Sequence, residues 1–211
     1  MVSAAQSVPT RRQRTKVILR KSLLCGAVLL GLLYVAAAVD ARLGRGSEVE
    51  AFGRATGAPD QSNWSQERVR QFAAARQSLA GGPIALVRIP SLQLSVPLYA
   101  TATELHLNRG VGLIEHMAQP GEGGNLGIAG HRDGFFRALR GIARGDLIEV
   151  QTHQRTYRYR VVATQIVAAT DATPLADTSA PTVTLVTCYP FYYLGHAPQR
   201  FVVRGSYLAK E

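Results

Sequence analysis

Cysteine is scarce in this 211-residue chain, which contains only Cys25 and Cys188. Cys25 lies in an apolar stretch near the N-terminus, and Cys188 lies near the other end of the chain. If the apolar stretch spans a membrane, the two thiols are in different phases and cannot form a disulfide. Structural cysteines of exported domains usually occur in pairs, so a lone Cys188 indicates either a reactive thiol or a small buried hydrophobic side chain.

Acidic residues are also few, with 14 Asp and Glu against 24 Lys and Arg, which gives a formal net charge of +10. The excess is concentrated at the N-terminus, where no acid occurs before residue 22. The remainder of the chain is only mildly basic, so we expect no nucleic-acid partner. The basic residues of this tail are Arg11, Arg12, Arg14, Lys16, Arg20 and Lys21.

Residues 22–39 form a run of eighteen residues without a charge. At about 1.5 Å per helical residue this run spans roughly 27 Å, close to the thickness of a bilayer core. Basic residues before such a span stay in the cytoplasm, so we expect a cytoplasmic tail (1–21), a single-pass anchor in the cell membrane (22–39) and an extracytoplasmic remainder. A cleaved signal peptide and a buried core helix are the alternatives, but the run exceeds the 7 to 15 residues of a signal-peptide core.

Residues 40–82 are predicted to form a linker and one amphipathic helix. Glycines, a proline and scattered charges in residues 41–60 are typical of a linker. Asn63 is a candidate N-cap with Gln66 three residues later, and apolar residues recur at helical spacing until Gly81. We therefore expect a short juxtamembrane helix from about Trp64 to Ala80.

From residue 83 to residue 211 the pattern changes to short β-rich runs separated by Pro and Gly. Seven or more short strands in this length favour an all-β domain built as a small closed or nearly closed barrel. The expected strands are Ile84–Ile89, Leu94–Tyr99, Leu126–Ala129, Leu147–Thr152, Tyr157–Ala169, Thr182–Thr187 and Phe201–Leu208.

Three side chains that could together form a site for nucleophilic catalysis lie at strand ends. Cys188 follows the strand Thr182–Thr187, and Arg200 opens the last strand twelve residues later, so a hairpin-like connection would bring the two together. His131 follows the run Leu126–Ala129. A neighbouring histidine can take the proton of a thiol and activate it as a thiolate. Each residue also has a structural explanation: His131 could bond its loop, Arg200 could pair with an acid, and Cys188 could be core.

Other polar residues near these positions are weaker candidates. Asp133 could orient His131 but is favoured as the cap of the segment 134–136, and His196 is the one competitor for the role of base. The histidines other than His131 show no metal-ligand spacing, so we expect no metal and no obligatory cofactor. They are His106, His116, His153 and His196.

Together these segments resemble the sortase family, whose signature is Thr-Leu-x-Thr-Cys followed about a dozen residues later by arginine, with an upstream histidine. Here the signature is Thr184–Cys188 and Arg200, with His131 57 residues before the cysteine. The resemblance covers roughly 84–207, and the segments 125–133 and 188–191 look most like class D sortases.

The resemblance implies an eight-stranded sortase barrel and a cysteine transpeptidase. Cys188 would attack an LPXTG-like sorting signal near the C-terminus of substrate proteins and form a thioester. An amine acceptor of the cell envelope would resolve it, which attaches the substrate covalently to the surface. His131 would move the protons, and Arg200 would stabilise the oxyanion or position the substrate.

Other enzyme classes and a non-enzymatic function remain open as alternatives. A hydrolytic cysteine peptidase of the envelope would let water resolve the thioester, but NlpC/P60 peptidases usually place cysteine before histidine. L,D-transpeptidases need a Ser-His-Gly-Cys-like stretch, which this chain lacks. A membrane-tethered barrel with a buried, inert Cys188 would instead be a binding module. The absence of a C-terminal apolar segment favours surface anchoring over pilus assembly.

Overall fold

The computed structural model describes residue 31 and residues 59–76, 81–192, 195 and 197–208. The chain divides into two units, residues 1–48 and 49–211, and the second unit contains every described strand. The predicted cytoplasmic tail and almost all of the predicted anchor lie outside the described residues. Among the residues that are described, no helix has the length and apolar character needed to cross a bilayer.

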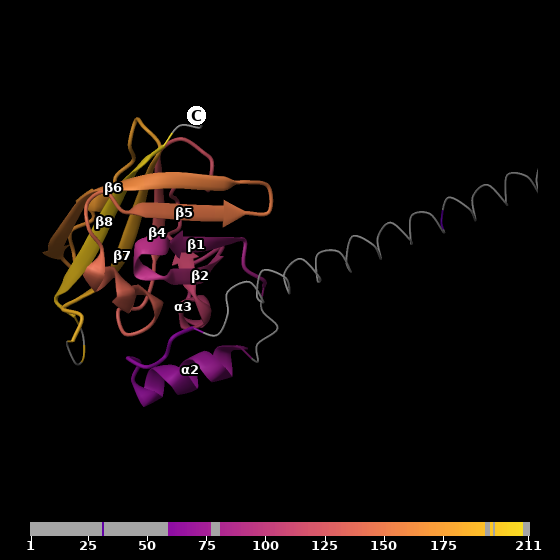
Figure 1. Ribbon diagram of the computed structural model, residues 1–211, viewed down its shortest axis with the longest axis vertical. Coiled ribbons are helices and arrows are strands. Elements are labelled where there is room, and N and C mark those ends of the chain that lie inside the picture. Colours follow the sequence, from indigo (N-terminus) through magenta and orange to yellow (C-terminus); the bar gives the residue numbers. More distant parts are fainter. Residues whose placement is uncertain (1–30, 32–58, 77–80, 193–194, 196, 209–211) are drawn as a thin grey trace, which may run out of the picture. The chain divides into compact units, whose positions relative to one another are not determined.

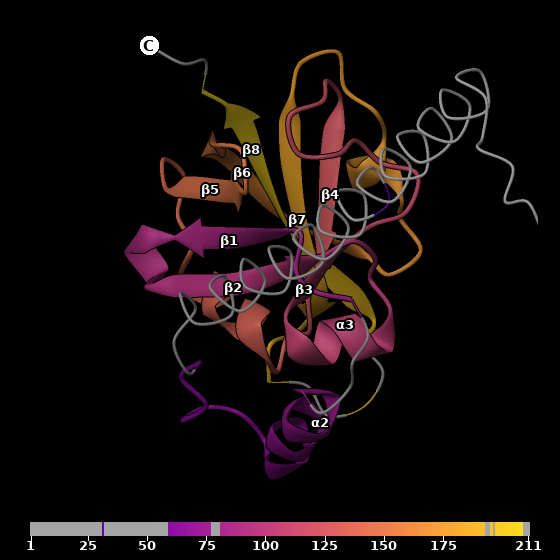
Figure 2. The same cartoon turned by 90° about the vertical axis from the view of Figure 1, so that its right-hand side faces the viewer.

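Eight strands close into one barrel, which confirms the all-β class and the expected eight-stranded architecture (Figure 1 and Figure 2). Around the barrel the order is β1-β2-β3-β4-β7-β8-β6-β5. β7 lies between β4, to which it is parallel, and β8, to which it is antiparallel. The strands are β1 (Ala85–Ile89), β2 (Leu94–Tyr99), β3 (Val111–Leu113), β4 (Asn125–Ala129), β5 (Leu147–Thr152), β6 (Thr156–Ala168), β7 (Thr182–Tyr189) and β8 (Gln199–Tyr207).

The barrel interior is filled by the inward faces of these strands. Along the first half of β6, Tyr157 and Tyr159 are buried whereas Arg158 and Arg160 are exposed, which is the alternation of a half-buried strand. β4 is instead buried at four of its five positions and β7 at five of its eight, with the less buried residues towards the end of each strand. The interiors of these two strands are therefore enclosed, and their ends, where the candidate site lies, are partly exposed.

The predicted helix is confirmed over α2 (Gln66–Arg76), and residues 77–80 lie outside the described residues. Its capping side chain is Ser65 rather than Asn63, because the Ser65 Oγ accepts a 3.1 Å hydrogen bond from the Arg68 backbone N–H. The Asn63 side chain is occupied elsewhere and donates to Ser62 Oγ. In both views α2 lies outside the barrel and next to a second helix, α3 (Glu104–Arg109) (Figure 1 and Figure 2).

Two elements were not predicted from the sequence, α3 and the three-residue strand β3. α3 lies in the connection between β2 and β3, which pair in parallel with Leu98 opposite Val111. Both α3 and β3 are too short to show a periodic pattern, and Gly112 in the middle of β3 lowers its strand propensity. Three 3-10 helices complete the fold: η1 (Pro90–Leu92), η2 (Phe135–Gly141) and η3 (Thr173–Leu175).

A buried polar network ties the connection between β6 and β7 to the barrel wall. The Thr184 hydroxyl of β7 donates to the Asn125 side-chain oxygen of β4 at 2.7 Å. The Asn125 amide in turn donates to the backbone oxygens of Pro174 and Ala176 at 3.1 and 2.9 Å. One asparagine therefore holds two strands and the η3 segment in a fixed arrangement.

We expect Thr184→Val to lower the free energy of unfolding by about 1–3 kcal/mol, because it removes a donor from a buried acceptor without changing the side-chain volume. Equilibrium urea unfolding of the full chain in detergent, followed by circular dichroism, would measure the change. Thr164→Val is the matched control, because Thr164 is exposed on β6 and its replacement should change stability by no more than about 0.5 kcal/mol. Equal effects of the two substitutions would contradict the network's contribution.

Candidate active site

Cys188 is the next-to-last residue of β7, so the thiol lies where the strand ends and the connection to β8 begins. It is half-buried and not part of a disulfide. In the β7–β8 ladder its backbone partner is Arg200, which confirms the expectation that the hairpin brings these two positions together. β7 continues two residues further than expected, to Tyr189, before Pro190 removes a backbone donor.

His131 follows β4 closely and is held beside the end of β7 through its neighbour Gly130. The Gly130 N–H donates to the Val186 oxygen at 3.1 Å, and the Thr187 hydroxyl donates to the Gly130 oxygen at 2.8 Å. A side chain at position 130 would meet the ring of Phe136 at 2.6 Å, so only glycine permits this close approach. These bonds therefore hold the backbone just before His131 against the end of β7, one residue before Cys188.

Among the described residues, no acidic side chain pairs with Arg200. Its Nη1 donates to the backbone oxygens of Gln199 and Ala197 at 3.0 and 3.3 Å. Arg200 also lines a cavity of about 140 Å³ next to η3, whose walls include the apolar residues Leu175 and Val202. The cavity therefore lies next to the backbone position that pairs with Cys188.

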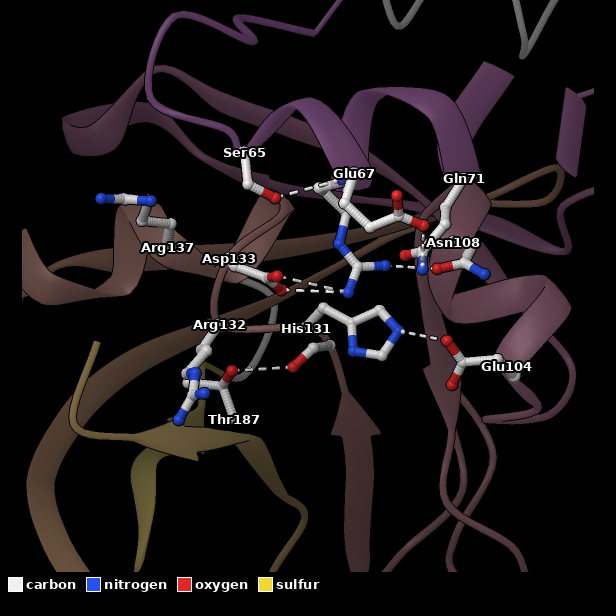
Figure 3. A network of polar contacts seen from close by, with 12 residues as sticks. Ser65, Glu67, Gln71, Glu104, Asn108, His131, Arg132, Asp133, Arg137 and Thr187 are labelled. Atoms are coloured by element: carbon white, nitrogen blue, oxygen red, sulfur yellow. Dashed lines mark hydrogen bonds and ion pairs between the residues drawn. The ribbon is translucent and has the colours of Figure 1, made fainter. Parts of the chain in front are cut away.

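Backbone pairing thus brings Cys188 and Arg200 together, and the bonds of Gly130 hold the start of the His131 loop against the end of β7. In the part of the chain that the structure describes, the side chains of Cys188, His131 and Arg200 make no direct hydrogen bond to one another. His131 contacts a carboxylate instead: its Nε2 lies 3.4 Å from Glu104 Oε1 of α3 (Figure 3). This is an ion-pair distance, without the alignment of a hydrogen bond.

Burial lowers the pKa of His131 below its ordinary value of 6.5, and the positive charge of Arg68 lowers it further. The carboxylates of Glu104 and Asp133 act in the opposite direction without reversing the shift. The neutral imidazole therefore predominates at neutral pH, which is the form that can accept a proton from a thiol.

Asp133 does not cap the segment that follows it, so that prediction is wrong. η2 begins after Gly134 without a side-chain cap, and the Asp133 carboxylate pairs with the Arg68 guanidinium at 3.1 Å (Figure 3). A buried guanidinium needs a charged partner more than a short helix needs a cap, and this pairing takes Asp133 away from η2. The carboxylate in contact with His131 is that of Glu104.

Several residues that shape the site were not singled out from the sequence. Glu104 lies on the unpredicted helix α3, and Arg68 lies on the predicted helix but far from the site in sequence. Arg132 was seen only as part of a motif, yet it donates to the Pro190 and Gly195 oxygens at 3.4 and 2.8 Å and so holds the connection between β7 and β8. His196, the competing base, lies outside the described residues.

The other histidines show no sign of a shared site. His106 stacks on Tyr99 with ring centroids 4.9 Å apart, and its Nδ1 is 2.8 Å from the Thr101 hydroxyl. Within residues 59–76, 81–192 and 197–208, no group of three or more His, Cys, Asp or Glu side chains could hold a metal ion.

Comparison with known proteins identifies the family and the fold. A family model described as the sortase domain matches residues 87–208. The chain is 30% identical over 122 residues to Sortase D of Bacillus subtilis, covering 57% of this chain and 62% of that protein. It is 26% identical over 127 residues to Sortase A of Bacillus anthracis, covering 58% and 59%. The chain thus spans about six-tenths of the length of these curated relatives.

Solved structures give the same result. A Sortase D5 transpeptidase of Clostridium perfringens superposes with a TM-score of 0.55 at 25% identity, covering 70% of this chain and 91% of that one. Sortase C1 of Streptococcus agalactiae superposes with a TM-score of 0.57 at 27% identity, covering 70% and 78%.

We expect Glu104→Gln to lower the pKa of His131 further, because the Glu104 carboxylate raises it in the native protein. NMR titration of the imidazole C–H signals, assigned with a His131→Gln variant, would measure this pKa. Glu122→Gln removes the same charge from an exposed loop and serves as the control. The difference should shrink at high salt, because Glu104 is largely exposed to solvent. An unchanged or raised pKa would contradict the contact.

Proposed function

The chain belongs to the sortase family, and from that premise we propose that it is a cysteine transpeptidase. It cuts an LPXTG-like sorting signal of substrate proteins and transfers the acyl part to an amine of the cell envelope. The observation that carries this proposal is the in-register pairing of Cys188 with Arg200, beside the strand end that delivers His131.

The first step joins the substrate to the enzyme. His131 accepts the thiol proton, and the Cys188 sulfur bonds to the carbonyl carbon of the signal's threonine. The bond between that carbon and the nitrogen of the next residue breaks, and the departing amine takes the proton from the His131 imidazolium. The product is a thioester at Cys188 and a released C-terminal fragment.

The second step reverses the proton flow. The incoming amine attacks the thioester carbon and loses a proton to the neutral His131, and the sulfur leaves as a thiolate. In each step the neutral His131 first accepts a proton, so a histidine with a pKa below its ordinary value suits both. No cofactor is required for this sequence of steps.

Arg200 is proposed to stabilise the negative oxygen that develops in both steps. A guanidinium keeps its charge and offers several donors, and losing one such donor typically costs on the order of 10² to 10³ in rate. The adjoining cavity, with walls that include Leu175 and Val202, suits the leucine and proline that begin an LPXTG-like signal. Arg200 would then contact the substrate on the side next to the scissile bond.

We further propose that residues 22–39 anchor the protein in the cell membrane, with the barrel outside the cytoplasm. The uncharged run of eighteen residues and the preceding basic cluster support this arrangement. It would place the barrel in the compartment where envelope amines are available.

We expect the purified full chain in detergent to cleave a quenched LPXTG or LPXTA peptide, and to ligate the product to triglycine when that amine is present. Cys188→Ala should abolish both reactions, because the thioester cannot form. Cys25→Ala is the matched control and should retain both, because Cys25 lies in the predicted anchor. Mass spectrometry of the products measures cleavage and ligation separately.

The outcomes distinguish the remaining functions. Cleavage that depends on Cys188 but never yields a ligated product would indicate a hydrolytic peptidase. Cleavage that survives Cys188→Ala would show that the nucleophile is wrong. If no peptide is cleaved and the folded protein resists alkylation at Cys188, the barrel is a binding module.

We expect the full chain to remain in the membrane fraction after carbonate extraction. Leu29→Arg combined with Leu30→Arg should release it, because each central charge opposes insertion by about 2.5–3.5 kcal/mol. Leu43→Arg, in the predicted linker, is the control and should leave the protein membrane-bound. A soluble native protein whose N-terminus begins just after Ala38 would show a cleaved signal peptide instead.

A further inference from the structure

The helix α2 is fastened to the segment that follows His131. Phe72 of α2, Trp64 just before it and Phe135 of η2 form an aromatic cluster with ring centroids 5.0 to 5.9 Å apart and edge-to-face geometry. Phe135 lies four residues after His131. The helix therefore packs, through Phe135, on the segment that directly follows the loop of the proposed base His131.

Within this contact lies Arg68, a charged residue that is only 8% exposed. An arginine is rarely buried to this extent unless its guanidinium is paired. Arg68 Nη2 lies 3.1 Å from Asp133 Oδ1, and Nη1 donates to the side-chain oxygen of Asn108. Asp133 belongs to the His131 loop, and Asn108 belongs to α3.

Asp133 and Asn108 lie on opposite sides of the space next to the His131 ring (Figure 3). The loop supplies the imidazole, and α3 supplies Glu104, which contacts its Nε2. One guanidinium from α2 thus joins the two elements that hold the imidazole. Arg70 of the same helix instead pairs with Glu67 on the helix surface.

We propose that Arg68 is a positioning residue for His131, which it holds in place by joining Asp133 of the catalytic loop to Asn108 of α3. This inference rests on the proposed role of His131 as the base. Arg68 itself contacts Asp133 and Asn108 and acts on the imidazole only through these residues and its charge. Its effect is to fix the ring between the end of β4 and α3, so that the proton donor and acceptor atoms meet in both transfer steps.

The charges around His131 allow positioning to be separated from simple electrostatics. The groups that face it are Arg68 from α2, Glu104 from α3 and Asp133 from its own loop, with Cys188 and Arg200 at the ends of β7 and β8. Arg68 lowers the pKa of His131, whereas Asp133 raises it. Removing the Arg68 charge should therefore raise the pKa of His131, and removing the Asp133 charge should lower it.

The test compares Arg68→Met with Asp133→Asn in the full chain in detergent. If Arg68 and Asp133 act by positioning, both variants should lower kcat for the LPXTG peptide by about tenfold or more, with KM changed less. In NMR titrations the pKa of His131 should rise in Arg68→Met and fall in Asp133→Asn. A loss of kcat in both variants, despite opposite pKa shifts, is a pattern that a purely electrostatic role would not produce.

Arg70→Met is the matched control, because it removes the same side chain from the exposed face of the same helix. It should keep kcat and the His131 titration at wild-type values. Arg68→Lys covers the possibility that Arg68→Met does not fold, which circular dichroism would reveal. Lysine keeps the charge but cannot span two partners with one planar group, so kcat should still fall while the pKa of His131 stays closer to that of the wild type.

The proposal is overturned if Arg68→Met or, where it does not fold, Arg68→Lys keeps kcat within twofold of the Arg70→Met control. It is also overturned if the His131 titration is the same in Arg68→Met, Asp133→Asn and wild type. The titration does not depend on turnover. Failure of the wild-type protein to cleave any peptide would therefore count against the proposed function, while an unchanged titration would count against the role of Arg68.

Discussion

The register of β7 between its two neighbours is the constraint on which the site depends. In this strand, side chains alternate between the two faces of the sheet, so a shift by one residue would turn Cys188 away and break its pairing with Arg200. Two buried hydroxyls oppose such a shift. Thr184 bonds Asn125 of β4, and Thr187 bonds Gly130 just beyond β4, so the strand is fixed in its middle and again one residue before the thiol.

The barrel alone does not fix His131, because the histidine lies beyond the end of β4 and outside the ladder. Its ring is bounded instead by α3 through Glu104 and by the loop that Arg68 holds through Asp133. A buried guanidinium without partners would cost several kcal/mol, so α2 can pack here only if Asp133 and Asn108 are in place. The helix that precedes the barrel is in this way part of the site.

Every strand except β3 was predictable because alternation and flanking Pro or Gly are local signals, and β2 and β5 have the expected bounds. The backbone proximity of Cys188 and Arg200 followed from the length of their connection. α3 and the contacts of Arg68 were not predictable, because Arg68 and Asp133 are 65 residues apart and no local pattern pairs them. The cap at Ser65 was missed because Asn63 and Ser65 are both good N-caps, and only geometry decides between them.

Charges of opposite sign approach His131 from different elements, and this affects both proton transfers. Arg68 and burial favour the neutral ring, which can accept a proton from the thiol or from an incoming amine. Glu104 and Asp133 favour the imidazolium, which must persist until the leaving amine takes its proton. With burial and Arg68 alone, the imidazolium would be too unstable to form. With the two carboxylates alone, the imidazolium would resist losing its proton. Because Glu104 is exposed and Arg68 is buried, the favoured neutral form is set by the interior of the protein, and the opposing influence is open to screening by solvent.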